Sequence, residues 1–287
     1  MLRKREELSI QLEHVRVQAQ IYGNPKSFPL LCLHGWLDNS SSYEGLAKHL
    51  DNLYLIALDF PGHGYSDHLP HGMRYNFSEL AAVIYGCIRK LKLNHYGLMG
   101  HSMGAGAATL AAAVLGEPLK ALILLDGIGP ISQKPADAPD SMRKSILSFH
   151  RMAEKKMPIY QSRQRAITAR MNAGNIDKES VVKLVKRGLE KTSDGYRWRS
   201  DPRLKVPSLH RFTEEQVIEF IKQIECPTLM LMAKNGFPGL YELAQHRAKH
   251  LQKLEYHDVN GGHHVHMDNP KPLANKIMAF VKKQSLI

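Results

Sequence analysis

The sequence predicts an α/β protein with a doubly wound, mostly parallel sheet. Two observations support this fold class. Short apolar segments alternate with longer helical patterns along most of the chain, and the later apolar segments are apolar throughout, as strands covered by helices on both faces should be. Alternating strands and helices give parallel strands joined by right-handed crossovers, and such sheets bind ligands at the carboxyl ends of their strands.

The expected elements follow one another in a regular order outside residues 131–224. The expected strands are residues 8–21, 30–35, 53–60, 96–100, 121–127, 228–234 and 254–259. The expected helices are residues 42–50, 76–92, 102–116, 239–250 and 270–284.

The alternation stops between residues 131 and 224. The sequence pattern predicts helices near 141–157, 159–171, 178–190 and 213–222 in this region, and it predicts no strand there. An all-helical insertion between two parallel strands would lie over the carboxyl ends of the sheet as a lid. We therefore expect an α/β core formed by 1–130 and 225–287, and a helical cap formed by 131–224.

The composition is that of a soluble globular protein, since 43% of the residues are hydrophobic and 23% are charged. No apolar segment approaches the roughly 18 residues that span a membrane. The N-terminal residues are charged and lack the apolar segment of a secretory signal. Cys32, Cys87 and Cys226 show no paired spacing, so we expect reduced thiols and a cytoplasmic location.

The net charge of +12 is concentrated in one segment. Residues 134–211 hold 19 Lys and Arg against 8 Asp and Glu. Such a segment can attract anionic substrates or contact an anionic lipid surface, or it can simply be the solvated face of several helices. We expect no nucleic-acid partner, because no aromatic residues are interleaved with the basic ones and no nucleic-acid motif is present.

The pattern Gly100-His101-Ser102-Met103-Gly104 lies between an expected buried strand and an Ala-rich helix. A very tight turn there projects the serine hydroxyl from the backbone and leaves no space for side chains at positions 100 and 104. A serine that only capped the helix would require no glycine on both sides. We therefore predict that Ser102 is a nucleophile.

The alkoxide that forms during attack by a serine requires backbone N–H donors. The amide of Met103 lies at the start of the expected helix, and the amide of Trp36 follows the strand at 30–35. Both are predicted oxyanion donors. His34, His101 and His266 are candidates for the substrate pocket, although a histidine placed like His34, just before such a turn, more often orders the loop by hydrogen bonds.

The general base is expected on the loop after the last strand. His263, His264 and His266 lie there, and the two glycines before His263 indicate a sharp turn that directs this side chain inward. His263 is the predicted base. Three close histidines also suggest a metal site, but no carboxylate-rich motif accompanies them, so neither a metal nor an organic cofactor is expected.

The acid that orients the base is harder to place. The loop after the strand at 228–234 holds no carboxylate, whereas Asp126 closes the apolar strand at 121–127 and therefore lies at the carboxyl edge of the sheet. We predict Asp126 as the acid. Asn235 remains an uncharged alternative, and Asp59 is expected to order its own glycine-rich loop.

These motifs together resemble an α/β-hydrolase-fold serine hydrolase, and more narrowly the serine hydrolase-like protein branch. The resemblance rests on His34-Gly35-Trp36, DFPGHGYSD at 59–67, the Ser102 turn and NGGHHVHMDNP at 260–270, and it covers nearly the whole chain. It implies a Ser–Asp–His triad and a helical cap between the sixth and seventh strands of the sheet.

The resemblance also bears on the acid and on the reaction. In some dehalogenase-like relatives the acid follows the sixth strand, where Asp126 falls, although the commoner place is after the seventh strand. Haloalkane dehalogenases and epoxide hydrolases carry an aspartate in place of Ser102, so their alkyl-enzyme chemistry is not expected here.

The expected activity is hydrolysis of carboxylic esters of small molecules through an acyl-enzyme. The same residues also suit a carbon–carbon bond hydrolase or a perhydrolase, and the fold can serve as a ligand receptor with slow turnover. We expect a monomer or a homodimer.

Overall fold

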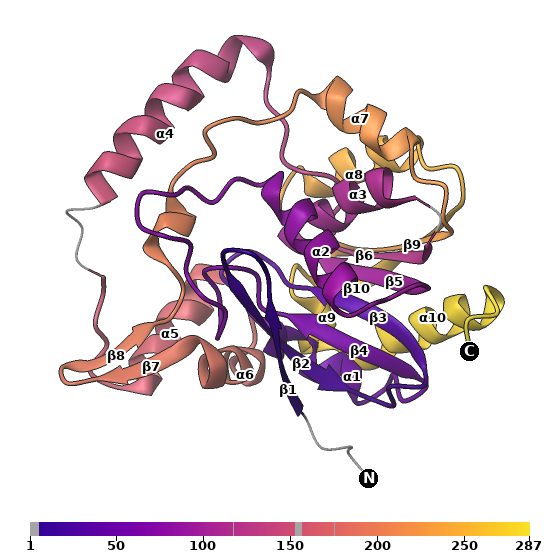
Figure 1. The fold of residues 1–287 in the computed structure, drawn as a ribbon, viewed down its shortest axis with the longest axis horizontal. Helices are drawn as coiled ribbons and strands as arrows, with labels where there is room; N and C mark the ends of the chain where they lie inside the picture. The colour runs from indigo at the N-terminus through magenta and orange to yellow at the C-terminus, as the bar shows by residue number, and fades with distance from the viewer. Residues whose placement is uncertain (1–5, 117, 153–156, 175) are drawn as a thin grey trace.

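An eight-stranded sheet forms the centre of the protein (Figure 1). The computed structural model describes residues 6–116, 118–152, 157–174 and 176–287. The sheet contains β1 (Glu6–Gln11), β2 (Arg16–Tyr22), β3 (Phe28–Leu33), β4 (Leu53–Leu58), β5 (Tyr96–His101), β6 (Leu119–Leu125), β9 (Thr228–Asn235) and β10 (Leu254–Gly262). Their order across the sheet is β1-β2-β4-β3-β5-β6-β9-β10, and every neighbouring pair from β4 to β10 is parallel. The predicted mostly parallel sheet is confirmed.

Helices cover both faces of this sheet. The helices of the core are α1 (Glu44–Ala47), α2 (Glu79–Lys90), α3 (Met103–Leu115), α8 (Leu240–Ala248), α9 (Val265–Asp268) and α10 (Pro270–Lys283). One apolar cluster joins the sheet to α2, α3, α7 (Glu214–Lys222) and α8, and a second cluster joins its other face to α1 and α10. Burial on both faces explains why the central strands are continuous apolar runs.

The first expected strand, residues 8–21, is wrong as a single element. The chain forms two antiparallel strands, β1 and β2, and β2 is also antiparallel to β4. The amide of Leu12 donates to the carbonyl of Val15 (3.0 Å) and closes the turn between the two strands. The polar pair Glu13-His14 at this turn interrupts the strand pattern.

The segment between β6 and β9, called the insertion below, lies between the sixth and seventh strands of the sheet. It contains α4 (Ala138–Met152), α5 (Arg163–Gly174), α6 (Lys178–Gly188), β7 (Leu189–Thr192), β8 (Gly195–Trp198) and α7. In Figure 1, α4 stands at the edge of the molecule, α5, α6 and the β7–β8 hairpin lie together below it, and α7 lies with the core helices. The described residues also include short 3₁₀ helices at Ser40–Tyr43, Pro135–Asp137 and Pro202–Lys205.

The expectation of an all-helical insertion is wrong, because β7 and β8 form an antiparallel hairpin. Ser193-Asp194 makes the turn, and Gly195, the first residue of β8, has a φ of 140°, which glycine adopts readily. Each strand has four residues, too few to produce a clear alternation of apolar and polar side chains. Tyr160 extends the hairpin by pairing with Tyr196 in both directions (2.7 and 2.8 Å).

The insertion has a small apolar cluster of its own, formed mainly by α5 and α6, and Met267 of α9 belongs to this cluster. Met267 follows the expected catalytic loop, so the insertion contacts the core beside that loop. Among the residues that the structure describes, no helix has the length and apolarity needed to cross a membrane.

A fully buried ion pair fastens the insertion to the core. Arg187 of α6 is 0% exposed, and its Nε lies 2.6 Å from Oδ2 of Asp59 while its Nη1 lies 2.7 Å from Oε1 of Glu7. Asp59 also accepts hydrogen bonds from the amides of Ser40 and Tyr65, both at 2.8 Å. Asp59 thus orders its own loop, as expected, and also binds the insertion.

Replacing Arg187 with Met should lower the free energy of unfolding by about 3–5 kcal/mol, because the Asp59 carboxylate then stays buried without its counter-charge. Arg197→Met is the matched control, since Arg197 pairs with Glu190 at an exposed position and its removal should cost less than about 1 kcal/mol. Urea unfolding of both variants measures the difference. Equal losses in the two variants would contradict the role assigned to the buried pair.

Candidate active site

Ser102 lies in a strained turn between β5 and α3. Its φ of 51° and ψ of −114° are unfavourable for a residue with a side chain. A Cβ at position 100 would lie 2.3 Å from the carbonyl oxygen of Gly104, and a Cβ at position 104 would lie 1.9 Å from the carbonyl oxygen of Leu33. The two glycines are therefore required sterically, and the turn directs the Ser102 hydroxyl away from the backbone.

His263 lies beside Ser102, although 161 residues separate them in the chain. Nε2 of His263 is 2.8 Å from Oγ of Ser102, and Nδ1 is 2.6 Å from Oδ2 of Asp126. A carboxylate can only accept, so Nδ1 carries the proton and Nε2 accepts from the Ser102 hydroxyl. His263 is buried and follows directly after β10.

Asp126 follows the last residue of β6 and is buried, with a φ of 46°. Its Oδ1 accepts from the amide of Ala233 (2.9 Å), which leaves Oδ2 for His263. A Cβ at Gly236 would lie 2.8 Å from Oδ2 of Asp126, so glycine leaves the carboxylate its space. Asn235, the alternative, is exposed at the end of β9, and Nδ1 of His263 is bonded to Asp126 instead.

The two predicted oxyanion donors come from adjacent segments. Met103 is the first residue of α3, and Trp36 lies in the turn after β3. Gly104 packs on the carbonyl oxygens of Leu33 and His34, which brings that turn beside the start of α3. The indole of Trp36 is half-exposed, and its Nε1 donates to the carbonyl of Leu204 in the insertion (3.0 Å).

His34, His101 and His266 are all enclosed, with exposures of 0%, 1% and 0%. Nε2 of His34 accepts from the amide of Phe60 (3.0 Å), and its Nδ1 donates to the carbonyl of Gly35 (2.7 Å). These contacts match the alternative in which His34 orders the turn. The three exposures give no support to a pocket wall formed by these side chains, because a substrate contacts only accessible atoms.

Sequence reasoning missed a charged group behind the turn after β3. Asp38 is buried, and its Oδ1 accepts from Nη2 of Arg170 in α5 (2.7 Å). Its Oδ2 lies 3.7 Å from Nε2 of His264. Burial opposes ionisation of Asp38, but His264 and the Arg170 guanidinium outweigh it and lower the pKa of the carboxyl. No spacing in the sequence connects residues 38 and 170, so only folding reveals the pair.

Phe237 was also missed. Its ring centroid lies 4.2 Å from that of His263, and the side chain is 53% exposed. The loop after β9 holds no carboxylate, and a single aromatic residue in it forms no recognisable sequence motif. An exposed aromatic ring on this imidazole shields one of its faces from water and offers an apolar surface beside Ser102.

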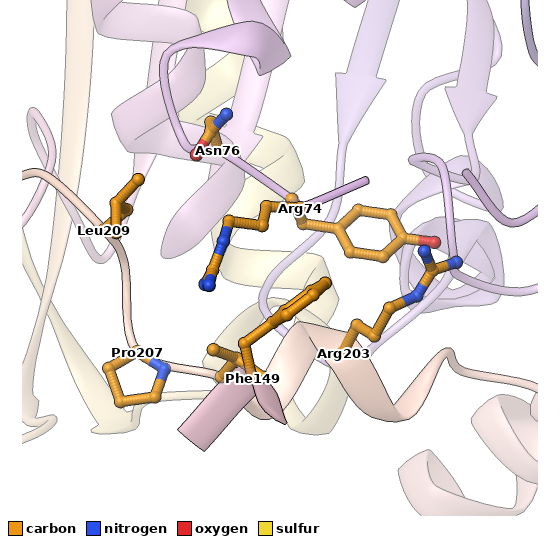
Figure 2. A pocket seen from close by; sticks show the side chains of 8 residues that line it. Arg74, Asn76, Phe149, Arg203, Pro207 and Leu209 are labelled. Atoms are coloured by element: carbon orange, nitrogen blue, oxygen red, sulfur yellow. The ribbon is translucent and has the colours of Figure 1, made fainter. Parts of the chain in front are cut away.

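The cavity drawn in Figure 2 lies apart from these residues. Its lining includes Arg74, Phe149 and Pro207, and the Arg74 guanidinium lies 4.0 Å from the centroid of the Phe149 ring. Its volume of about 10 Å³ accommodates about one water molecule, so it is no substrate site. In the described part of the chain, no three His, Cys, Asp or Glu side chains are grouped in a way that could hold a metal ion.

Known proteins resemble this chain over nearly its whole length. The profile of the alpha/beta hydrolase fold family matches residues 29–270. A probable serine hydrolase of Drosophila melanogaster is 32% identical over 97% of this chain and 88% of its own length. A serine hydrolase-like protein of Danio rerio is 28% identical over 99% and 91%. A solved structure of a hypothetical protein of Pseudomonas aeruginosa is 34% identical, with a TM-score of 0.88 over 96% and 97% of the two chains.

Buried histidines should make the fold sensitive to acid. Burial lowers the pKa of His34 and His264 to about 4, and that of His63 and His266 to about 3, from an ordinary 6.5. Below pH 6.5 the unfolded chain binds protons at these residues and the folded protein does not. The free energy of unfolding should therefore fall as the pH is lowered from 6.5 to about 4.

Replacing His266 with Leu isolates one of these groups. The pH dependence of the free energy of unfolding should become shallower than in the wild type by about 1.4 kcal/mol per pH unit between pH 6 and 4. Urea unfolding at several pH values gives both slopes. Identical slopes would contradict a neutral, buried His266 in the folded protein.

Proposed function

Because the chain belongs to the α/β-hydrolase family, we propose that it is a serine hydrolase that cleaves carboxylic esters through an acyl-enzyme. One observation carries the proposal. Ser102 Oγ, the imidazole of His263 and the carboxylate of Asp126 form a continuous hydrogen-bonded chain, with contacts of 2.8 and 2.6 Å. This is the arrangement that activates a serine for attack on a carbonyl carbon.

In the first half of the reaction, Ser102 Oγ attacks the ester carbonyl and Nε2 of His263 takes the hydroxyl proton. Asp126 keeps the proton of Nδ1 in place and stabilises the imidazolium. The amides of Trp36 and Met103 bind the oxyanion of the tetrahedral intermediate. Collapse of the intermediate breaks the bond to the alcohol oxygen, which leaves with the proton from Nε2.

In the second half, His263 removes a proton from a water molecule that attacks the acyl carbonyl. A second tetrahedral intermediate forms in the same oxyanion site. Its collapse breaks the bond to Ser102 Oγ, which takes the proton back, and releases the carboxylic acid. Both halves use the same three side chains, so no other proton carrier is required.

Two exposed aromatic residues of the core support a substrate of the apolar, small-molecule class. Trp36 and Phe237 are large aromatic residues that stay half-exposed beside the predicted oxyanion turn and the imidazole. In this proposal residues 131–224 act as a cap over the site, and residues 1–130 and 225–287 form the catalytic core. Carbon–carbon bond hydrolysis and perhydrolysis use the same residues and remain alternatives, as does a receptor with slow turnover.

Ser102→Ala and His263→Ala should each lower kcat by about 10³–10⁶-fold, since neither nucleophilic attack nor proton transfer can then occur. A series of p-nitrophenyl esters from acetate to palmitate measures kcat and defines the preferred acyl length. A fluorophosphonate probe should label the wild type rapidly at Ser102. Rapid labelling without ester turnover would favour the receptor, and substantial turnover by Ser102→Ala would overturn the proposed function.

Asp126→Asn and Asn235→Ala test the acid. We expect Asp126→Asn to lower kcat by about 10³–10⁴-fold, because the amide no longer fixes the tautomer of His263. Asn235→Ala should leave kcat near the wild-type value, because this side chain is exposed and His263 is bonded elsewhere. A larger loss of kcat in Asn235→Ala than in Asp126→Asn would contradict the assignment of Asp126 as the acid.

The outer surface of α4 favours a second, more specific candidate, hydrolysis of lipid esters at an anionic membrane surface. Met142, Ile146 and Leu147 are 43%, 41% and 49% exposed. The basic residues Arg143 and Lys144 lie between them and are also exposed. Apolar side chains among cations are typical of helices that lie in a lipid interface.

Vesicle binding tests this candidate. The wild type should bind vesicles of phosphatidylcholine and phosphatidylserine more strongly than phosphatidylcholine alone, and salt should weaken the binding. Arg143→Gln/Lys144→Gln should lower the partition coefficient at least tenfold, at about 1 kcal/mol per charge. Lys271→Gln/Lys282→Gln on α10 is the matched control. If the two double variants lowered the partition coefficient equally, net charge alone would explain the binding, and α4 would have no specific role.

A further inference from the structure

His101 connects the three segments of the candidate active site. It is the last residue of β5, it precedes Ser102 directly, and it is 1% exposed. Its ring contacts the loop that carries His263 and the turn that carries Trp36. No other role follows from its position, because its burial keeps it from a substrate.

We infer that His101 is a positioning residue, which fixes the main chain of His263 so that Nε2 of His263 stays within reach of Ser102. The inference rests on the proposed function. The contact that carries it is a hydrogen bond of 2.8 Å between Nε2 of His101 and the carbonyl oxygen of His263. The two rings also lie with their centroids 4.7 Å apart.

The main chain of His263 requires such support. Gly261 and Gly262 precede it, and Gly261 has a φ of 144°, a backbone conformation that only glycine adopts without strain. Glycines allow a sharp turn, but they restrict the backbone weakly. Asp126 holds the ring of His263 and His101 holds its carbonyl, so the side chain and the main chain of the base are fixed separately.

The tautomer of His101 follows from the lengths of its contacts. A carbonyl only accepts, so Nε2 at 2.8 Å carries the proton. Nδ1 then has a lone pair and lies 3.9 Å from Oδ2 of Asp38, too far for a hydrogen bond. Burial lowers the pKa of His101 well below 6.5, so the ring stays neutral. The shorter contact decides the tautomer.

The unpaired Nδ1 argues against a purely packing role. Nδ1 is buried without a hydrogen-bond partner, which is unfavourable compared with an apolar side chain of similar shape. A residue that only filled space would avoid this cost. The ring also packs closely on the oxyanion turn, because a Cβ at Gly35 would lie 2.8 Å from Nδ1.

Loss of the hydrogen bond should affect the chemical step more than substrate binding. A displacement of the base by about 1 Å can lower the rate about 10²-fold, because the reacting atoms then leave their productive geometry. His101 touches no substrate in this arrangement. We therefore expect a lower kcat with a KM close to that of the wild type.

His101→Gln and His101→Met form a matched pair for the test. The two side chains have similar length and shape, but only glutamine retains an N–H donor near the position of Nε2. With a p-nitrophenyl ester as substrate, His101→Met should lose at least tenfold in kcat, and His101→Gln should recover most of that loss. Equal kcat values in the two variants, or a loss confined to KM, would overturn the inference.

Long-range ¹H–¹⁵N NMR of the histidine-labelled wild type tests the contact independently of His101→Met, so it still applies if that variant fails to fold. His101, assigned by its absence in His101→Gln, should show the Nε2–H tautomer across the pH range of activity. The Nδ1–H tautomer would overturn the inference. Wild-type protein that shows no ester turnover and no labelling of Ser102 would instead overturn the proposed function.

Discussion

The strained turn at Ser102 is the constraint on which the candidate site depends. The backbone of this residue is tolerated only because Gly100 and Gly104 leave space for the main chain to close around it. The amide of Ser102 donates to the carbonyl of Leu125 (3.1 Å), so the turn is tied to the end of β6. Asp126 follows that residue, and the same hydrogen bond therefore sets the proposed acid at a fixed place relative to Ser102.

The remaining contacts fix loops that the sheet alone would leave free. The loop of His263 is held by Asp126 through the ring and by His101 through the main chain. The turn after β3 is held by hydrogen bonds of His34 to the backbone. Catalysis requires groups placed within a fraction of an ångström, and each loop here has an enclosed polar side chain that supplies this precision.

Charged contacts join the insertion to these same loops. Arg170 pairs with Asp38, which is buried in the turn after β3, and Arg187 pairs with Asp59, which is buried in the loop that follows β4. Removing one partner of a buried pair leaves an uncompensated charge, so the insertion cannot separate from the core at little cost. The insertion is therefore part of the architecture of the candidate site.

The sheet class, the Ser102 turn and the place of Asp126 are predictable from the sequence, because they depend on local patterns: apolar strands, glycines at fixed spacing, and an acid at the end of a strand. The β7–β8 hairpin is not predictable in this way, because its strands are too short to show the alternation of apolar and polar side chains. The hydrogen bond of the enclosed His101 to His263 and the pairing of Arg170 with Asp38 arise only when the chain folds. Such contacts join residues more than 130 positions apart, and no local pattern encodes a distance between them.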